Sequence, residues 1–125
     1  MKKEVFKHEI TILKNTYIRL LRRNAKTNLI KLIKKTHPAD LAIVFRYFDD
    51  EQQSEIFNLM KNDEHTLEFL IELDDVFIGK LLNLESPERI TKIIQDASAN
   101  DQSYIISALE NKNAESVINQ LKIEE

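Results

Sequence analysis

Seven pairs of adjacent apolar residues recur along this chain at an almost constant spacing, which constrains the fold more than any other feature. Successive pairs begin 12, 13, 12, 12, 12 and 12 residues apart. The pairs are Val44-Phe45, Ile56-Phe57, Phe69-Leu70, Leu81-Leu82, Ile93-Ile94, Ile105-Ile106 and Val117-Ile118. A step of this length accommodates one short helix and one tight turn, and a helix of two turns cannot bury its apolar face alone. Each repeat must therefore stack on its neighbours, which predicts an all-α superhelix.

A third apolar residue follows most pairs and extends the predicted apolar face of each helix. These residues are Phe48, Met60, Leu73, Ala97, Leu109 and Leu121. One repeat departs from the pattern, because Glu85 occupies this position and Leu84 lies beside it. Superhelices of this kind present extended surfaces to partners, so the repeats favour an interaction function over catalysis.

A longer helix is predicted before the repeats, over residues 3–23. Its apolar residues recur at steps of three and four and form one stripe. They are Phe6, Ile10, Leu13, Tyr17 and Leu21. We expect a turn over residues 24–28 and a second helix over residues 28–35. The predicted organisation is a basic helical segment, residues 1–35, followed by a repeat segment, residues 36–125, in one compact domain.

Each predicted repeat helix begins at a residue that can cap it. Pro38 suits the first helical position, where its missing N–H needs no partner. The other predicted starts are Asp49-Asp50, Asn62-Asp63, Asp74-Asp75, Ser86-Pro87-Glu88, Asn100-Asp101 and Asn113. Capping and the helix dipole account for acidic residues at such places, so most of these acids are interpreted as structural.

The net charge of −3 conceals a strong asymmetry along the chain. Residues 1–36 contain 11 Lys/Arg and 2 Asp/Glu, whereas residues 37–125 contain 7 Lys/Arg and 19 Asp/Glu. Three interpretations of the basic segment stay open. It solvates an amphipathic helix, it contacts an anionic membrane surface through residues 2–35, or it binds nucleic acid. The last is disfavoured, because the rest of the chain would repel phosphates.

Several classes of chemistry have no support in the sequence. The chain has no Cys for thiolate or disulfide chemistry, and its single glycine, Gly79, cannot form a phosphate-binding loop. His8, His37 and His65 form no zinc motif. We therefore predict that the chain is not an enzyme. No apolar run approaches the roughly 18 residues of a membrane span, and no signal core follows Met1, so we expect a cytoplasmic protein.

The segment Thr36-His37-Pro38-Ala39-Asp40-Leu41-Ala42, followed by Asp49-Asp50-Glu51 and the short repeats, resembles the cytosolic N-terminal domain of MgtE-type magnesium transporters. The resemblance covers about residues 36–121 and implies a right-handed superhelix. The flagellar motor switch protein FliG has related repeats with a similar His-Pro opening. A freestanding FliG-like scaffold for protein interactions is therefore the alternative.

The resemblance implies a regulatory function. In that family the domain precedes a pair of CBS domains, a connecting helix and a membrane pore, and magnesium ions between the N domain and the CBS pair hold the closed state. We therefore expect a magnesium-sensitive brace that docks on a CBS-type or other downstream domain and controls gating. Its place would be the cytoplasmic face of the membrane, in a transporter that forms a homodimer, with no nucleic-acid partner.

The resemblance also implies candidate Mg²⁺ ligands. The family's acidic ligand in the third repeat corresponds to Glu68, and an Asp pair corresponds to Asn100-Asp101, where one carboxylate has become an amide. A further Asp corresponds to Tyr104, which cannot serve as a carboxylate ligand. The implied metal residues are Glu68, Asp101 and Asn100, at a weak interfacial site. As the structural alternative, Asp101 is a first-turn acid and Glu68 a solvated helix residue. Other acids that could compensate are Asp74, Asp75 and Asp96.

Overall fold

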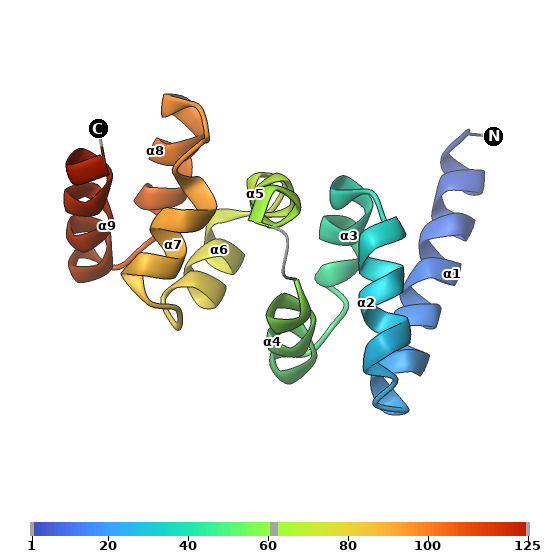
Figure 1. Ribbon diagram of the computed structural model, residues 1–125. Coiled ribbons are helices and arrows are strands. Elements are labelled where there is room, and N and C mark those ends of the chain that lie inside the picture. Colours follow the sequence, from blue (N-terminus) through green and yellow to red (C-terminus); the bar gives the residue numbers. More distant parts are fainter. Residues whose placement is uncertain (1, 61–62, 125) are drawn as a thin grey trace. The chain divides into compact units, whose positions relative to one another are not determined.

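The computed structural model describes the backbone of residues 2–60 and 63–124 and the side chains of residues 7–60 and 64–122. The regular elements of these residues are all helices, which confirms the all-α prediction (Figure 1). They are α1 (Lys2–Arg22), α2 (Lys26–Lys35), α3 (Pro38–Phe45), α4 (Asp50–Leu59), α5 (Asp63–Ile71), α6 (Asp75–Leu82), α7 (Pro87–Ile94), α8 (Ala99–Ser107) and α9 (Asn111–Glu124). From α3 onward they begin 12, 13, 12, 12, 12 and 12 residues apart, the step of the apolar pairs. A search of the described helices finds none with the length and apolar character needed to span a membrane.

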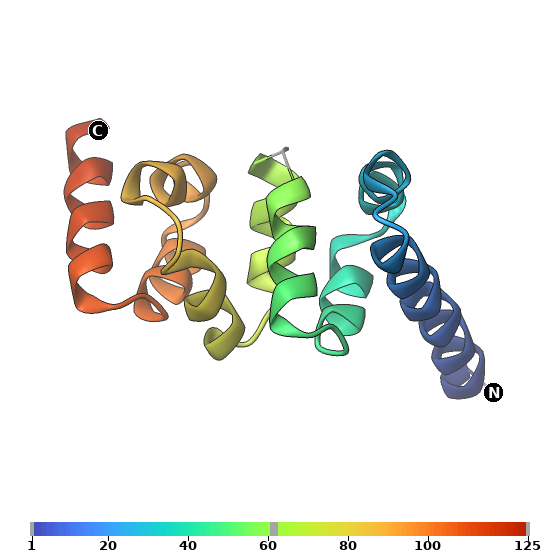
Figure 2. The ribbon, with the colours of Figure 1, turned by 90° about the horizontal axis from the view of Figure 1, so that it is seen from below.

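Contacts within the chain divide it into two units, residues 1–61 and residues 62–125, and each is described by itself. In the first unit α1 packs on α2 and α3, and α2 packs on α4 (Figure 2). In the second unit α5 packs on α7 and α8, α6 packs on α8, and α9 packs on α7 and α8. Pairs of helices two positions apart in the chain recur in both units, as α1 with α3 and α2 with α4 in the first and α5 with α7 in the second. This pairing gives each short helix a surface on which to bury its apolar face.

The core of the first unit is centred on aromatic side chains. The ring of Phe48 lies 5.8 Å from that of Tyr17 and 6.1 Å from that of Phe45, centroid to centroid. The hydroxyl of Thr36 donates to the carbonyl of Leu32 (2.6 Å), so it accepts the hydroxyl hydrogen of Tyr17 (2.8 Å). Burial raises the pKa of Tyr17 to about 12, against a lowering by the Thr36 hydrogen bond. The predicted inward position of Tyr17 is confirmed.

A glutamine at the fourth position of a helix caps the end of the preceding helix in both units. In α4, the amide Nε2 of buried Gln53 donates to the carbonyls of Phe45 (3.2 Å) and Phe48 (3.1 Å). In α8, Nε2 of half-buried Gln102 donates to the carbonyls of Ile94 (2.9 Å) and Gln95 (3.3 Å). These bonds occupy carbonyls that a helix end leaves without intrahelical partners.

Gly79 in α6 and Asn83, the C-cap residue of α6, fix the packing of α8 and α9 in the second unit. A Cβ built on Gly79 would lie 2.7 Å from the carbonyl oxygen of Ala108, so this close approach requires glycine. The side-chain oxygen of Asn83 accepts from the backbone N–H of Glu110 (3.0 Å) and from Nδ2 of Asn113 (3.0 Å). Asn83 therefore caps the start of α9 from a distant part of the sequence.

The predicted start of the second helix is wrong by two residues. The structure begins α2 at Lys26, because the chain reverses at Asn24, whose φ of 52° is the left-handed conformation that Asn tolerates. The N-cap residue of α2 is Ala25, which offers no side-chain acceptor. The turn is thus shorter than predicted, and Asn28 is helical.

Two predicted starts in the second unit also need correction. Ser98, not Asn100, caps α8, since its Oγ accepts from the N–H of Asp101 at 3.2 Å. The last helix begins at Asn111 rather than Asn113, which binds Asn83 instead. The predicted start at Asn62 lies outside the described residues.

The apolar pairs are buried unequally along the chain. The first residue of every pair is buried, and so is the second residue as far as Ile94. Ile106 is only half-buried, and Ile118 is 37% exposed. In the last pair, Val117 is buried and Ile118 lies nearer the surface, although α9 packs on both α7 and α8.

Candidate functional site

Three exposed glutamates form a row along α5 and the residue that follows it. Glu64 and Glu68 lie on one side of α5, and Glu72, four residues after Glu68, is the first residue beyond its end. The opposite side buries Phe69 and Leu70. Glu68, the predicted ligand, is the central member of this row. Like charges at this spacing repel one another by a few tenths of a kcal/mol per pair.

The other two predicted ligands lie in the first turn of α8, a helix that packs on α5. Asn100 is exposed and Asp101 is half-buried. Because the Oγ of Ser98 already caps this helix, the Asp101 carboxylate is not its N-cap. Its negative charge still favours the positive end of the helix dipole, so part of its role is structural.

Two further carboxylates, Asp74 and Asp75, lie near Tyr104, which is one turn further along α8 than Asp101. The Tyr104 hydroxyl donates to the carbonyl of Leu73 at 2.6 Å and so joins α8 to the turn between α5 and α6. Burial raises the pKa of Tyr104 above its ordinary value, and the charges of Asp74 and Asp75 raise it further. Asp74 occupies the N-cap position of α6 but makes no capping hydrogen bond with its side chain. Its carboxylate is therefore not committed to the helix that it precedes.

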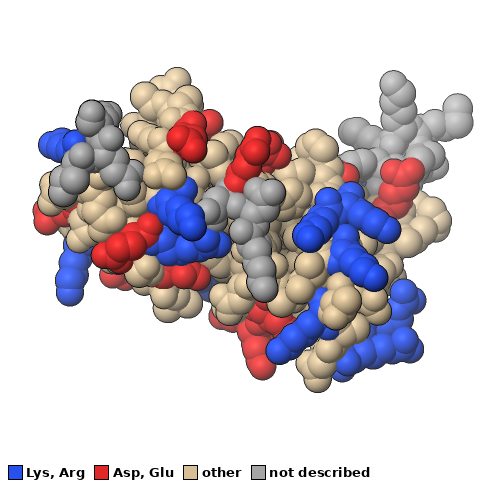
Figure 3. All heavy atoms as spheres, in the orientation of Figure 1, with Lys and Arg blue, Asp and Glu red and all other residues tan. Residues whose placement is uncertain are grey.

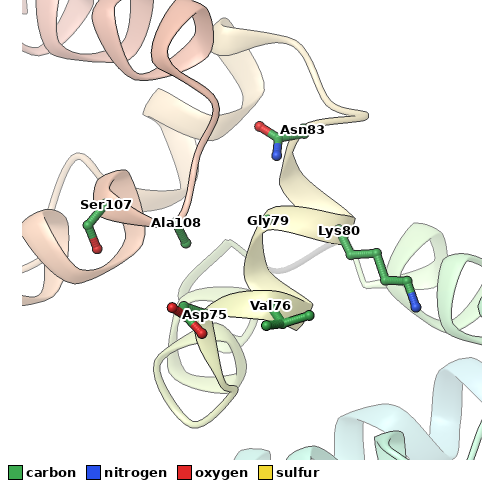
Figure 4. A pocket seen from close by; sticks show the side chains of 7 residues that line it. All are labelled: Asp75, Val76, Gly79, Lys80, Asn83, Ser107 and Ala108. Carbon is green, nitrogen blue, oxygen red and sulfur yellow. The ribbon is translucent and has the colours of Figure 1, made fainter.

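A hollow of about 360 Å³ opens beside this acidic group, between α6 and the end of α8 (Figure 4). Asp75 and Val76, in the first turn of α6, line the hollow, and so do Gly79 and Ala108, which approach each other closely. Val76 is 72% exposed, so the hollow has an apolar rim next to a carboxylate. Such a shape suits contact with another protein surface more than enclosure of a small ligand.

The acidic residues of the described part of the chain do not gather into a metal site of their own. Within residues 7–60 and 64–122, no three side chains of Asp, Glu, His or Cys come close enough to share an ion. Asn100 and Asp101 are neighbours on α8, and Glu68 lies on the helix packed against it. Mg²⁺ commonly takes one or two carboxylates and keeps several waters. Within the described residues the structure thus shows no grouping that would hold an ion by itself, and Glu68, Asn100 and Asp101 stay predicted ligands.

The sequence reasoning missed part of this surface. Glu64 and Glu72 were not singled out, although their spacing of four from Glu68 predicts a shared helix face. Asp74 and Asp75 were named only as acids that could compensate. Their proximity to Tyr104 depends on the packing of α8 against the end of α5, which no local pattern reveals.

The family model of the MgtE intracellular N domain matches residues 36–125. No curated protein and no solved structure matches the chain. The matched residues comprise helices α3 to α9, while α1 and α2 precede them.

Proposed function

Because this chain belongs to the family of the MgtE intracellular N domain, we propose that it is the magnesium-sensitive regulatory domain of a magnesium transporter. It docks on a CBS-type or other downstream domain and controls gating, at the inner face of the membrane, in a transporter that forms a homodimer. The family is that of a transporter domain and not of an enzyme, so we propose no catalytic activity. The match also favours this function over a freestanding FliG-like scaffold.

The acidic surface of the second unit carries the proposal. This unit contains 5 Lys/Arg and 14 Asp/Glu, a net charge of −9. Exposed carboxylates lie along α5 and at the turn before α6, and the half-buried Asp101 lies in the first turn of α8. Such a surface repels itself, and it repels any acidic surface brought against it.

Within this proposal, Glu68, Asp101 and Asn100 supply the Mg²⁺ ligands of the chain. A divalent ion bound there would neutralise two carboxylates and leave coordination positions for water and for the docking partner. The row of glutamates would orient the partner through Glu64 on α5 and Glu72 just after it. Loss of the ion restores the repulsion, so low magnesium would release the domain.

Thermal unfolding with and without Mg²⁺ tests the proposal. For a Kd of about 1 mM, about 10 mM MgCl₂ would stabilise the chain by about 1.4 kcal/mol, which is a Tm increase of a few degrees. We expect this increase to exceed that produced by NaCl of the same ionic strength. The double variant Glu68→Gln/Asp101→Asn should lose most of it.

The matched control is Glu110→Gln/Glu115→Gln, which removes two exposed acids at and before α9 and changes the net charge equally. This variant should keep the Mg²⁺-specific increase. Equal Tm increases in MgCl₂ and matched NaCl would contradict ion binding by this chain. Equal losses in the two double variants would show a general charge effect and no site.

A further inference from the structure

The stretch from residue 10 to residue 39 contains eight Lys/Arg and no Asp or Glu. It comprises most of α1, all of α2 and the bend between them. The cations are Lys14, Arg19, Arg22, Arg23, Lys26, Lys31, Lys34 and Lys35. Lys14 is half-buried, with its Nζ 5.2 Å from the ring centroid of Tyr47, and the other seven are exposed. All eight cations precede the residues that the family model matches, so the proposed docking function does not account for them.

Six of these cations form a continuous basic strip. Leu29 and Ile33 are buried on the side of α2 that faces α1 and α4. Lys31, Lys34 and Lys35 follow the spacing of the opposite face, and all are exposed. The bend adds three more, which complete the basic strip: Arg22, Arg23 and Lys26. Figure 3 shows Lys and Arg side chains gathered along α2 and at the bend.

Helix stability accounts for only part of the basic strip. Arg22 in the last turn of α1, and Lys34 and Lys35 in the last turn of α2, favour the negative ends of the helix dipoles. Lys26 lies in the first turn of α2, where a positive charge opposes the dipole. No acidic residue offsets Lys26 in that turn. Lys31 and Lys35 are four residues apart on one face of α2, so their positive charges repel each other. Arg22 and Lys26 have the same spacing across the bend between α1 and α2. An external anionic surface would relieve this repulsion.

We propose that the basic strip binds an anionic lipid surface. Long aliphatic stems on one exposed helix face let several ammonium and guanidinium groups reach a plane of headgroups at once. Nucleic acid fits less well, because the strip has no aromatic side chain on which a base could stack, and Tyr17 is buried. The helix packed on α2 is α4, which contains the acids Asp50, Glu51 and Glu55. With all acids counted, the first unit still has a net charge of +6. Proximity of the strip to a membrane rests on the proposed function.

Vesicle sedimentation with the full 125-residue chain tests this inference. The probes are phosphatidylcholine vesicles and vesicles that also contain phosphatidylserine, at an ionic strength of about 0.15 M. We expect binding only to the phosphatidylserine vesicles. Each cation near an anionic leaflet contributes about a fivefold change in affinity. The variant Lys31→Gln/Lys34→Gln/Lys35→Gln should therefore bind on the order of a hundredfold more weakly.

The control removes three exposed lysines from the second unit, Lys92→Gln/Lys112→Gln/Lys122→Gln, and gives the same net charge. It should bind as the parent does, and circular dichroism should show the same helix content in all three proteins. Equal binding to both kinds of vesicle, or equal losses in the two triple variants, would overturn the inference. So would tighter binding to a DNA duplex than to phosphatidylserine vesicles. No Mg²⁺ enters this assay, so its failure leaves the magnesium test of the second unit unaffected.

Discussion

The two units of this chain share a packing scheme and differ in charge. Both pair helices two positions apart, and both use a glutamine at the fourth helical position to cap the preceding helix. The first unit contains 13 Lys/Arg and 7 Asp/Glu, and the second contains 5 and 14. The comparison teaches that the 12-residue pattern determines the core and leaves the outward positions free. The sign of the surface charge is therefore a better guide to what each unit binds.

The largest predicted effect tests the core of the second unit alone. Ile94 is fully buried, so Ile94→Asp places an unpaired charge in the core and should cost about 3–5 kcal/mol. Hydrogen exchange should then show loss of amide protection in residues 63–124 and retained protection in the first unit. The matched control is Ile118→Asp, at the same position of the last pair but 37% exposed, which should change stability by less than about 1 kcal/mol. A fully folded Ile94→Asp protein would contradict the repeat packing.

A smaller effect compares the two glutamine caps directly. Gln53 is 3% exposed and Gln102 is half-buried, so water can replace the lost amide more readily at Gln102. We expect Gln53→Met to cost about 2 kcal/mol and Gln102→Met about 1 kcal/mol, measured by urea unfolding. Equal costs, or a larger cost at Gln102, would show that burial does not distinguish these caps.

The smallest effect at neutral pH concerns Tyr17 in the first unit. Tyr17→Phe should cost about 1 kcal/mol near pH 8 through loss of the hydrogen bond to Thr36. Burial raises the pKa of Tyr17 from 10.0 to about 12, so the neutral form is favoured in the folded state. The stability that comes from keeping Tyr17 protonated in the folded state is fully present below pH 10. It is lost as the pH rises from 10 to about 12.

Unfolding of Tyr17→Phe and of the parent chain, followed near pH 8 and near pH 11, measures this contribution. The parent chain should lose stability more steeply than Tyr17→Phe over this range, by roughly 1.4 kcal/mol at pH 11. Parallel pH profiles would contradict a raised pKa at Tyr17.

The helices could be predicted because their signals are local. The spacing of pairs such as Val44-Phe45 and the start signal Ser86-Pro87 lie within one repeat. One signal was present but not used. The single step of 13, from Ile56 to Phe69, coincides with the boundary between the two units. The predicted segments, residues 1–35 and 36–125, stay predictions.

The features that could not be predicted join residues far apart in sequence. Asn83 caps α9 across 27 residues, and Tyr104 binds the Leu73 carbonyl across 31 residues. Both contacts depend on how α6 and α8 pack, which apolar spacing alone does not specify. Glu68, Asn100 and Asp101 came from resemblance to a family. The row that surrounds Glu68 could have been found from its spacing on α5.

The central claim is that the acidic unit, and not the basic unit, responds to magnesium. Two-dimensional ¹H–¹⁵N NMR of the whole chain, titrated with MgCl₂ at constant ionic strength, tests this claim most directly. The account predicts saturable amide shifts in α5, in the turn before α6 and in the first turn of α8, with none in α1 or α2. Shifts spread evenly over both units, or no shift beyond that caused by NaCl, would contradict it.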